Sequence, residues 1–300
     1  MYGLWGWGCT GALCALLGVA SPPRAEPAGL SPVRLDRIVD SAAARGFSGH
    51  VLVGAIPPAG ASASAPPAVL YERVVGLADR ARGRPIRVGD AWRWASVTKQ
   101  VTAALVMQQV DSGRIALDEP VTRYLPDFAG PTGSAVTVRR LLQHTSELPN
   151  PSDTPRDGSP VVGYEGDGRP EPAFELATFG AAGALNGTAR DLLAFNHSLV
   201  GHRLVSPAST AEMWRGDPRL GYAALGAWSF PAALRGCAEP VRLIERRGAI
   251  GGIQVRNVIA PERGALIVFT NSAAVEFGEI WQGAGLSDDL LSVALCGDPA

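Results

Sequence analysis

Ser96 and Lys99 are the two residues of this sequence whose types and spacing could together do chemistry. Of the 27 lysine and arginine residues, only Lys99 is a lysine, so the sequence uses an amine at one place and guanidinium groups everywhere else. An arginine keeps its proton in a protein, whereas a buried lysine can become neutral and act as a base. On a helix this spacing puts both side chains on one face, where the amine can take the hydroxyl proton and create a nucleophile. The alternative is that Ser96 caps the helix and Lys99 is a solvated first-turn charge.

The residues around this pair indicate a helix that enters a packed interior. Trp92 and Trp94 precede the pair, and the apolar residues after it include Val97, Ala103, Ala104, Leu105 and Val106. The pattern predicts a helix that starts near Ser96 and ends near Gly113, with Lys99 starting among apolar neighbours. This setting favours the catalytic interpretation over the solvated one.

The N-terminal segments that must support this helix alternate between helix and strand. A helix is predicted over residues 31–46, with Ser31 as its cap and Gly46 at its end. Two β-rich runs follow, separated by a loop of low sequence complexity over residues 57–68. These strands are residues 49–55 and 69–77.

The middle of the chain, about 110–215, forms the helical part of the prediction. Thr137 and Thr188 are expected to cap two of its helices, and a third helix starts at Ser206 and Pro207. The predicted helices are residues 138–144, 189–199 and 207–214, with an ordered segment at 174–185 and a Pro-, Gly- and Asp-rich segment at 150–173. His144, at a helix end, is interpreted as complementing the helix dipole, and a catalytic role is the alternative.

The C-terminal part is β-rich and ends in a helix. The predicted strands form an antiparallel meander over residues 222–230, 241–247, 253–260 and 265–270, and Ser287 is expected to start a final helix, 286–295. Strands at both ends of the chain with helices between them predict an α+β fold. It is an α/β/α sandwich in which one antiparallel sheet from the N- and C-terminal segments is flanked by helices.

Composition and the N-terminal residues bear on the partners and the localisation of the protein. The 300 residues are 46% hydrophobic with a net charge of −1, which supports a full core and argues against a nucleic-acid partner. Residues 1–25 contain a short apolar run before small residues, which predicts a signal peptide and a secreted or periplasmic protein. The run is too short to span a bilayer, so no stable membrane span is expected. Residues 26–300 are then predicted to form a single domain.

Removal of residues 1–25 would leave Cys237 and Cys296 as the two cysteines. An even pair in an exported protein is compatible with a disulfide. Two unrelated buried thiols are the alternative, because spacing along the sequence does not show whether their Cα atoms approach.

Taken together, these segments resemble the serine beta-lactamase and penicillin-binding protein superfamily, within it the branch of class C beta-lactamases, D-alanyl-D-alanine carboxypeptidases and esterases. The resembling motifs run in order from about residue 31 to residue 272: Phe47-Ser48-Gly49, Trp94–Ala104, Leu117–Val121, Tyr124-Leu125-Pro126, Leu141–Ser146, Thr188–Leu192 and Leu204–Ala208. The resemblance implies an acyl-enzyme on Ser96, Lys99 as proton acceptor, and an oxyanion hole made by the N–H of Ser96 and one from a facing edge strand. It implies no cofactor, and no H-E-x-x-H, C-x-x-C or G-x-S-x-G motif points to a metal or triad hydrolase.

The sequence departs from the family at two motifs. The second motif, Tyr-x-Asn or Ser-x-Asn, is missing, and its helical region is reduced to residues 150–173; Tyr164 is the candidate acid or base that could replace it. The third motif is matched by Arg246, Arg247 and Gly248, which are predicted to bind substrate together with Ala249. Arginine keeps a positive charge for a carboxylate, and the N–H of Ala249 is the candidate second oxyanion donor.

Two functions are therefore expected from the sequence. The first is a serine hydrolase that uses Ser96 to form an acyl-enzyme with a small-molecule or peptide substrate carrying an ester, beta-lactam or D-Ala-type amide. The second is a catalytically impaired relative that binds peptidoglycan-like or other acylated ligands. The geometry of Lys99 separates them, because catalysis needs its amine within hydrogen-bond reach of Ser96 Oγ, opposite residues 246–249.

Overall fold

The structure is a computed structural model that describes residues 30–57, 66–128, 135–146, 161–172 and 176–297. The predicted signal peptide, residues 1–25, lies outside these ranges, as do most of the low-complexity loop and much of the segment 150–173. Within the described residues, no helix is long and apolar enough to cross a membrane.

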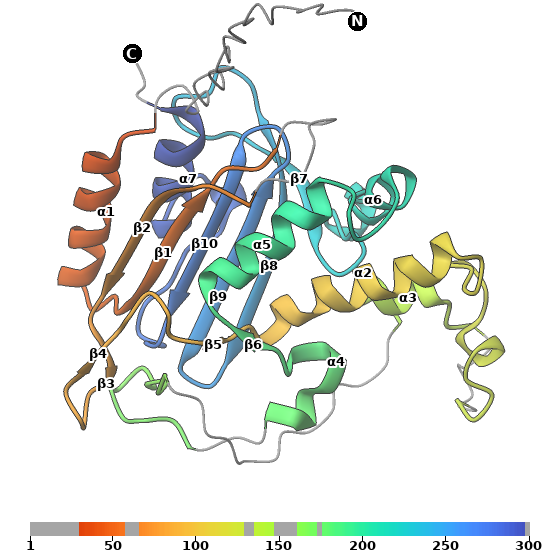
Figure 1. The fold of residues 1–300 in the computed structure, drawn as a ribbon, viewed down its shortest axis with the longest axis horizontal. Helices are drawn as coiled ribbons and strands as arrows, with labels where there is room; N and C mark the ends of the chain where they lie inside the picture. The colour runs from red at the N-terminus through yellow and green to blue at the C-terminus, as the bar shows by residue number, and fades with distance from the viewer. Residues whose placement is uncertain (1–29, 58–65, 129–134, 147–160, 173–175, 298–300) are drawn as a thin grey trace, which may run out of the picture.

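A six-stranded antiparallel sheet forms the centre of the molecule (Figure 1), in the order β2-β1-β10-β9-β8-β7. Its strands are β1 (Gly49–Gly54), β2 (Val69–Val75), β7 (Trp228–Ala232), β8 (Val241–Ile250), β9 (Ile253–Ala260) and β10 (Gly264–Thr270). β1 pairs with β10, so the first and last strands of the chain lie side by side. This pairing confirms the prediction that the N- and C-terminal segments build one sheet.

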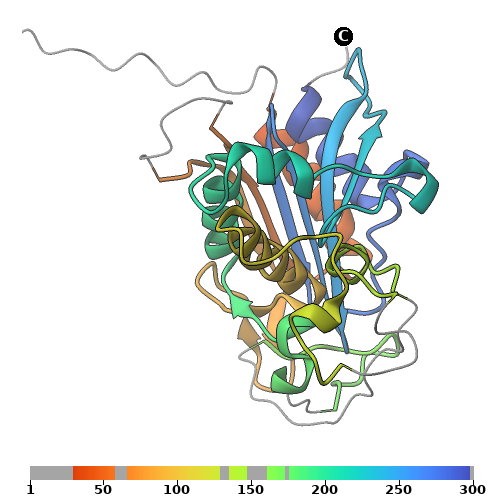
Figure 2. The ribbon, with the colours of Figure 1, turned by 90° about the vertical axis from the view of Figure 1, so that its right-hand side faces the viewer.

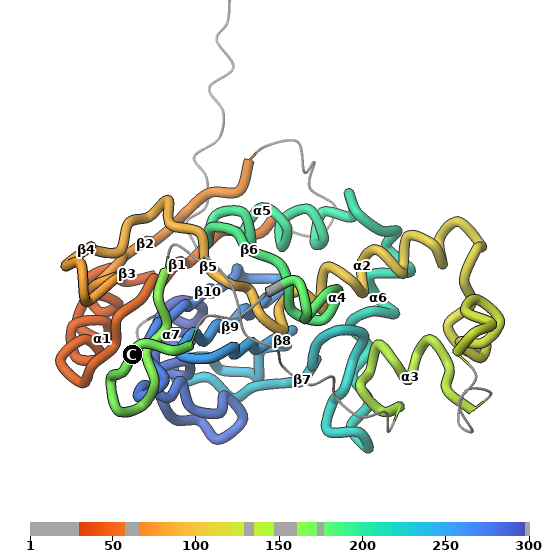
Figure 3. Tube along the Cα trace, turned by 90° about the horizontal axis from the view of Figure 1, so that it is seen from below, coloured from red at the N-terminus to blue at the C-terminus, as the bar shows by residue number. Residues whose placement is uncertain are grey.

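Helices cover both faces of the sheet, which confirms the expected α/β/α arrangement. Figure 3 shows α5 (Ala189–Val200) and α7 (Leu286–Cys296) on opposite sides of it. Alternation along β10 explains the layers, because Leu266 packs with α1 (Pro32–Ala44) and α7, whereas Ile267 packs with α5 and α2 (Thr98–Asp111). Figure 2 shows α1 and α7 together on one side and α2 on the other.

The predicted helices are present, although the predicted start of the last one is wrong. Thr137 and Thr188 accept backbone N–H groups and begin α3 (Val138–Leu142) and α5, as predicted. Ser31 is the N-cap residue of α1, as predicted, without a side-chain cap bond, whereas Ser287 lies inside α7, whose N-cap residue is Gly285. The remaining helical elements are α4 (Gly180–Gly183), α6 (Pro207–Met213) and the short 3-10 turns η1 (Ala95–Val97), η2 (Val121–Arg123), η3 (Leu176–Phe179), η4 (Pro218–Leu220) and η5 (Ile280–Gln282).

The strand predicted from residue 222 begins only at Trp228. Gly221 and Tyr222 both have positive φ angles, 61° and 63°, which an extended strand does not allow. Two small two-stranded sheets, β3 (Leu77–Asp79) with β4 (Arg84–Pro85) and β5 (Trp92–Arg93) with β6 (Asn186–Gly187), were not predicted because their runs are too short to show a pattern.

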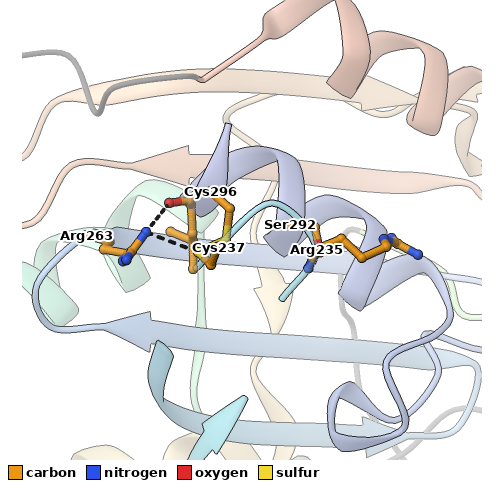
Figure 4. Close-up of a disulfide and its surroundings, with 6 residues drawn as sticks. Arg235, Cys237, Arg263, Ser292 and Cys296 are labelled. Atoms are coloured by element: carbon orange, nitrogen blue, oxygen red, sulfur yellow. Dashed lines mark hydrogen bonds between the residues drawn. A yellow bond between two sulfur atoms is a disulfide. The ribbon is translucent and has the colours of Figure 1, made fainter. Parts of the chain in front are cut away.

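A disulfide joins Cys237 to Cys296, with their Cα atoms 4.9 Å apart (Figure 4). It ties the connection between β7 and β8 to the last residue of α7. Arg263 braces the same place by donating to the carbonyl of Leu295 at 2.9 Å. The sequence left this pairing open, and the structure favours the disulfide over two separate thiols.

Candidate active site

Ser96 lies in the one-turn element η1, between β5 and the start of α2. The turn is held from outside, since Trp94 N–H donates to the carbonyl of Leu185 at 2.9 Å and Val97 N–H donates to that of Trp94. Ala95 has a φ of 45°, which a non-glycine residue adopts only when its surroundings impose it. The serine is thus presented on a rigid bend before the α-helix begins at Thr98, rather than on the first residue of that helix.

Lys99 points back at this serine, as the sequence predicted. Its Nζ lies 2.9 Å from Ser96 Oγ and donates to the carbonyl of Ala182, in α4, at 2.8 Å. Burial, and secondly the positive charge of Arg246, lower the pKa of Lys99 to about 8. A substantial fraction of the amine is therefore neutral near pH 8 and able to accept a proton from the hydroxyl.

The helix that carries Lys99 is fixed to the sheet through a buried amide cluster. Asn257 of β9 donates to Gln100 Oε1 at 2.8 Å and exchanges hydrogen bonds with Asn196 of α5 at 2.7 and 3.0 Å. All three side chains are almost fully buried, so their hydrogen bonds are shielded from competing water. Because Gln100 follows Lys99 directly, this cluster sets the position of the amine.

The part of β8 without a neighbouring strand forms the wall of the site opposite Ser96. β7 begins at Trp228, opposite Glu245, so from Arg246 onward β8 has no strand on this side among the described residues. Residues 246–249 line a cavity of about 520 Å³ together with Ser96. Arg246 is buried there and donates from Nε to the carbonyl of Ser96 at 3.0 Å. Burial lowers the pKa of Arg246 to about 10, so it remains a cation at neutral pH.

The structure separates the two arginines that the sequence grouped together. Arg246 contacts the serine, whereas Arg247 is turned toward Glu279 at 2.6 Å and Glu245 at 3.4 Å. The charge of Arg247 is thereby compensated by two carboxylates. It lines the cavity, but Arg246 is the cation that faces Ser96 and Lys99.

Tyr164 does not lie with this group, and its prediction as an acid or base is wrong. Its hydroxyl accepts the N–H of Arg80 at 2.5 Å, and the Arg80 guanidinium covers its ring at 3.9 Å. Its backbone pairs with that of Asn271 and Ala273, beside the end of β10. The side chain is buried in this contact, so its role is structural.

His144 lies closer to the site than the sequence suggested. It follows α3 and lines a cavity of about 280 Å³ with Trp228 and Arg246. Burial and the positive charges of Arg246 and Lys99 lower the pKa of His144 to about 4. The lowered pKa argues against the charged imidazole that the helix-dipole interpretation assumed.

One partner of the amine was invisible in the sequence. Lys99 Nζ is also held by the backbone carbonyl of Ala182, and a backbone carbonyl has no side-chain signature in a sequence. Within the described residues, no cluster of three or more His, Cys, Asp or Glu side chains could hold a metal ion.

We expect Gly248→Ala to destabilise the protein by about 1–3 kcal/mol, the usual cost of overpacking a filled interior. A Cβ at Gly248 would lie 2.7 Å from the Trp94 carbonyl oxygen and 2.9 Å from Ala95 Cβ, so the strand would have to move away from the serine turn. Denaturant unfolding measures the effect. The matched control is Gly89→Ala, where a Cβ meets nothing within 4 Å; equal stabilities of the two variants would contradict the expectation.

Comparisons with known proteins show what this chain is similar to. Residues 52–162 match the family model described as "Beta-lactamase". The chain is 43% identical over 119 residues to "Esterase EstB" from Burkholderia gladioli, an alignment that covers 38% of this chain and 28% of the esterase. The matched part is therefore less than a third of the esterase's length.

Solved structures extend the likeness over most of the chain. A D-amino acid amidase from Ochrobactrum anthropi SV3 superimposes with a TM-score of 0.65 at 19% identity, over 87% of this chain and 98% of the amidase. A class C beta lactamase from Rhodobacter sphaeroides gives 0.63 at 15% identity, over 86% of this chain and 98% of that one. At these identities the likeness shows a common fold, with the sheet and flanking helices seen here.

Proposed function

Because residues 52–162 match the beta-lactamase family model, we propose that the chain is a serine hydrolase of that family and forms an acyl-enzyme on Ser96. The observation that carries the proposal is the 2.9 Å contact between Lys99 Nζ and Ser96 Oγ, made by a lysine whose pKa lies near 8. A solvated first-turn lysine would be fully charged and would need no such contact.

The reaction begins with proton transfer to the amine. Neutral Lys99 takes the proton of Ser96 as Oγ attacks the substrate carbonyl carbon, and a tetrahedral oxyanion forms. The resulting ammonium returns the proton to the leaving alcohol or amine as its bond to the carbonyl carbon breaks, which leaves the acyl group on Oγ. Water then attacks the acyl carbon while Lys99 accepts one of its protons. The bond from that carbon to Oγ breaks as the ammonium returns the proton to Oγ, which releases the carboxylic acid and restores Ser96.

Backbone groups on the two walls stabilise the oxyanion in this proposal. The donors are the N–H of Ser96 and that of Ala249, which line one cavity. Support comes from the unpaired stretch of β8 beyond Glu245, where backbone groups are not all used by a neighbouring strand. Arg246, fixed on the carbonyl of Ser96, adds positive charge for a substrate carboxylate.

The substrate class follows from the catalytic groups that are present, which are Ser96, Lys99 and the two backbone N–H donors. An ester, a beta-lactam or a D-Ala-type amide would fit the mechanism, and esters are favoured because an alkoxide needs less proton help to leave than an amine. The lack of the family's second motif is the observation that favours the second candidate, a non-catalytic binder of peptidoglycan-like or other acylated ligands.

The test is covalent labelling of the folded protein with a fluorophosphonate and with a fluorescent penicillin. The proposal expects an adduct that mass spectrometry maps to Ser96 and that neither heat-unfolded protein nor the Ser96→Ala variant forms. A folded wild-type protein that stays unlabelled by both probes would overturn the hydrolase and support the binder.

The pH dependence of labelling is expected to follow Lys99. Because the neutral amine is the active form, the labelling rate should rise with pH with a midpoint at about 8. In Arg246→Gln the midpoint should move to higher pH, since the positive charge that helps to lower the pKa of Lys99 is gone. Arg247→Gln is the matched control and should keep the wild-type midpoint; equal midpoints in all three proteins would contradict this account of Arg246.

We also propose that the protein is exported, with residues 1–25 removed. The Cys237–Cys296 disulfide supports this, because such bonds persist in oxidising compartments. N-terminal sequencing of the protein recovered from its native cells tests the proposal, and a mature chain that still carries residues 1–25 would contradict it.

A further inference from the structure

An aromatic cavity of about 520 Å³ lies beside the candidate active site. Four rings form its walls, and we call it the aromatic pocket: Tyr222, Trp228, Phe230 and Trp281. Three of the rings contact one another. The ring centroid of Phe230 lies 6.0 Å from that of Trp281, in an edge-to-face contact, and 6.4 Å from that of Tyr222. They come from β7, the turn after η4, and η5, so three separate segments converge to make this pocket.

The aromatic pocket continues the cavity that contains Ser96. Trp228 and Arg247 line both spaces. The Arg247 guanidinium lies 5.2 Å from the Trp228 ring and 4.5 Å from the Trp281 ring, so it forms the threshold between the two. The two cavities are therefore neighbours, with this side chain between them.

The charges at this threshold define the kind of group that fits. Arg247 is paired with Glu279 at 2.6 Å and more distantly with Glu245, which also pairs with Arg256, so the Arg247 charge is largely taken up by Glu279. The rest of the pocket wall is aromatic rings, with Gly221 and Pro231, and contributes no charged side chain. An ionised group would lose hydration there without gaining a partner, whereas an uncharged ring would gain both burial and ring contacts.

Two rings of the aromatic pocket are partly exposed to water in the absence of a ligand. Trp281 is 55% exposed and Tyr222 is 36% exposed, which leaves large apolar surfaces in water next to a cavity. Concave sites lined by aromatic side chains are the usual form of small-molecule pockets, and the volume lies within their usual range. Exposed apolar surface that adjoins such a site marks a place where a ligand is buried.

We propose that the aromatic pocket binds an uncharged aryl group of the substrate while the scissile carbonyl lies at Ser96. The proposal rests on the proposed function for the position of the carbonyl. It narrows the substrates to esters or amides in which a benzyl-sized or larger ring is separated from the carbonyl by a short linker.

The kinetic test compares a phenylacetyl ester with the corresponding acetyl ester. In Trp281→Ala the ratio of kcat/KM for the two esters should fall roughly tenfold to a hundredfold, since that ring is a wall of the pocket. Tyr222→Ala should lower the ratio in the same direction and guards against a folding defect in the first variant. The matched control is Leu125→Ala, an apolar side chain 57% exposed elsewhere, which should keep the wild-type ratio. Wild-type ratios in both pocket variants would overturn the proposal.

A binding test separates this inference from the hydrolase assignment. Phenylacetamide and acetamide are titrated into the Ser96→Ala variant, and the indole N–H signals of Trp228 and Trp281 are followed by NMR. The proposal expects shifts with phenylacetamide and none with acetamide, whether or not Ser96 is a nucleophile. Absence of shifts with phenylacetamide, in a protein that folds normally, would overturn it even if turnover of esters is observed.

Discussion

Replacing Lys99 by arginine is expected to lower the rate of Ser96 acylation by roughly 10²- to 10⁴-fold, the range that a general base contributes. The guanidinium keeps the positive charge but does not give up its proton, so the hydroxyl of Ser96 loses its acceptor. The measurement is the second-order rate of labelling by a fluorophosphonate, with circular dichroism to show that the variant folds.

The control for this substitution is the reverse exchange at the far end of the same helix region, Arg114→Lys, where the side chain is exposed and bonded to Gln109. It should label at the wild-type rate. Lys99→Met should be as slow as the arginine variant, because an apolar side chain accepts no proton either. An arginine variant with wild-type labelling would show that the positive charge alone matters.

Removal of the disulfide is expected to have the largest effect on stability. The bridge joins residues 59 positions apart and closes a loop that contains β8, β9, β10 and α7. In the chain-entropy account, a loop of this length restricts the unfolded chain by about 4 kcal/mol, and measured losses are typically about 2–5 kcal/mol. The double variant Cys237→Ser, Cys296→Ser should therefore unfold at clearly lower urea concentration than the wild type.

Reductant provides the control for this second prediction. It should lower the unfolding midpoint of the wild type to that of the double variant and leave the variant itself unchanged. A wild-type midpoint insensitive to reductant, in protein shown by mass to carry the bond beforehand and free thiols afterwards, would contradict a stabilising role.

Local patterns predicted the fold well because its elements carry their own signals. The capping threonines at positions 137 and 188 and the β-rich runs near the C-terminus are readable within a few residues. The contact of Lys99 with Ser96 was predictable for the same reason, since the two lie on one turn of the chain. The pairing of β1 with β10 followed from the position of the strands at the two ends of the sequence.

The failures share a cause, which is that contacts distant in sequence decided the outcome. Tyr164 was a candidate by type, yet the backbone of Asn271 and the N–H of Arg80 hold it away from the serine. His144 was assigned to its helix end, whereas its pKa is lowered first by burial and then by the positive charges of Arg246 and Lys99, which come from two other elements. The carbonyl of Ala182 could not be identified at all, because any residue supplies one.

The most direct test of the central claim is the titration of Lys99 itself. Because it is the single lysine of the chain, protein labelled with ¹³C- and ¹⁵N-lysine gives one side-chain signal to follow against pH. The account predicts a midpoint of about 8, moving upward in Arg246→Gln. A midpoint near 10.4, the ordinary value for a solvated lysine, would mean that the amine is charged at working pH and is not the base for Ser96.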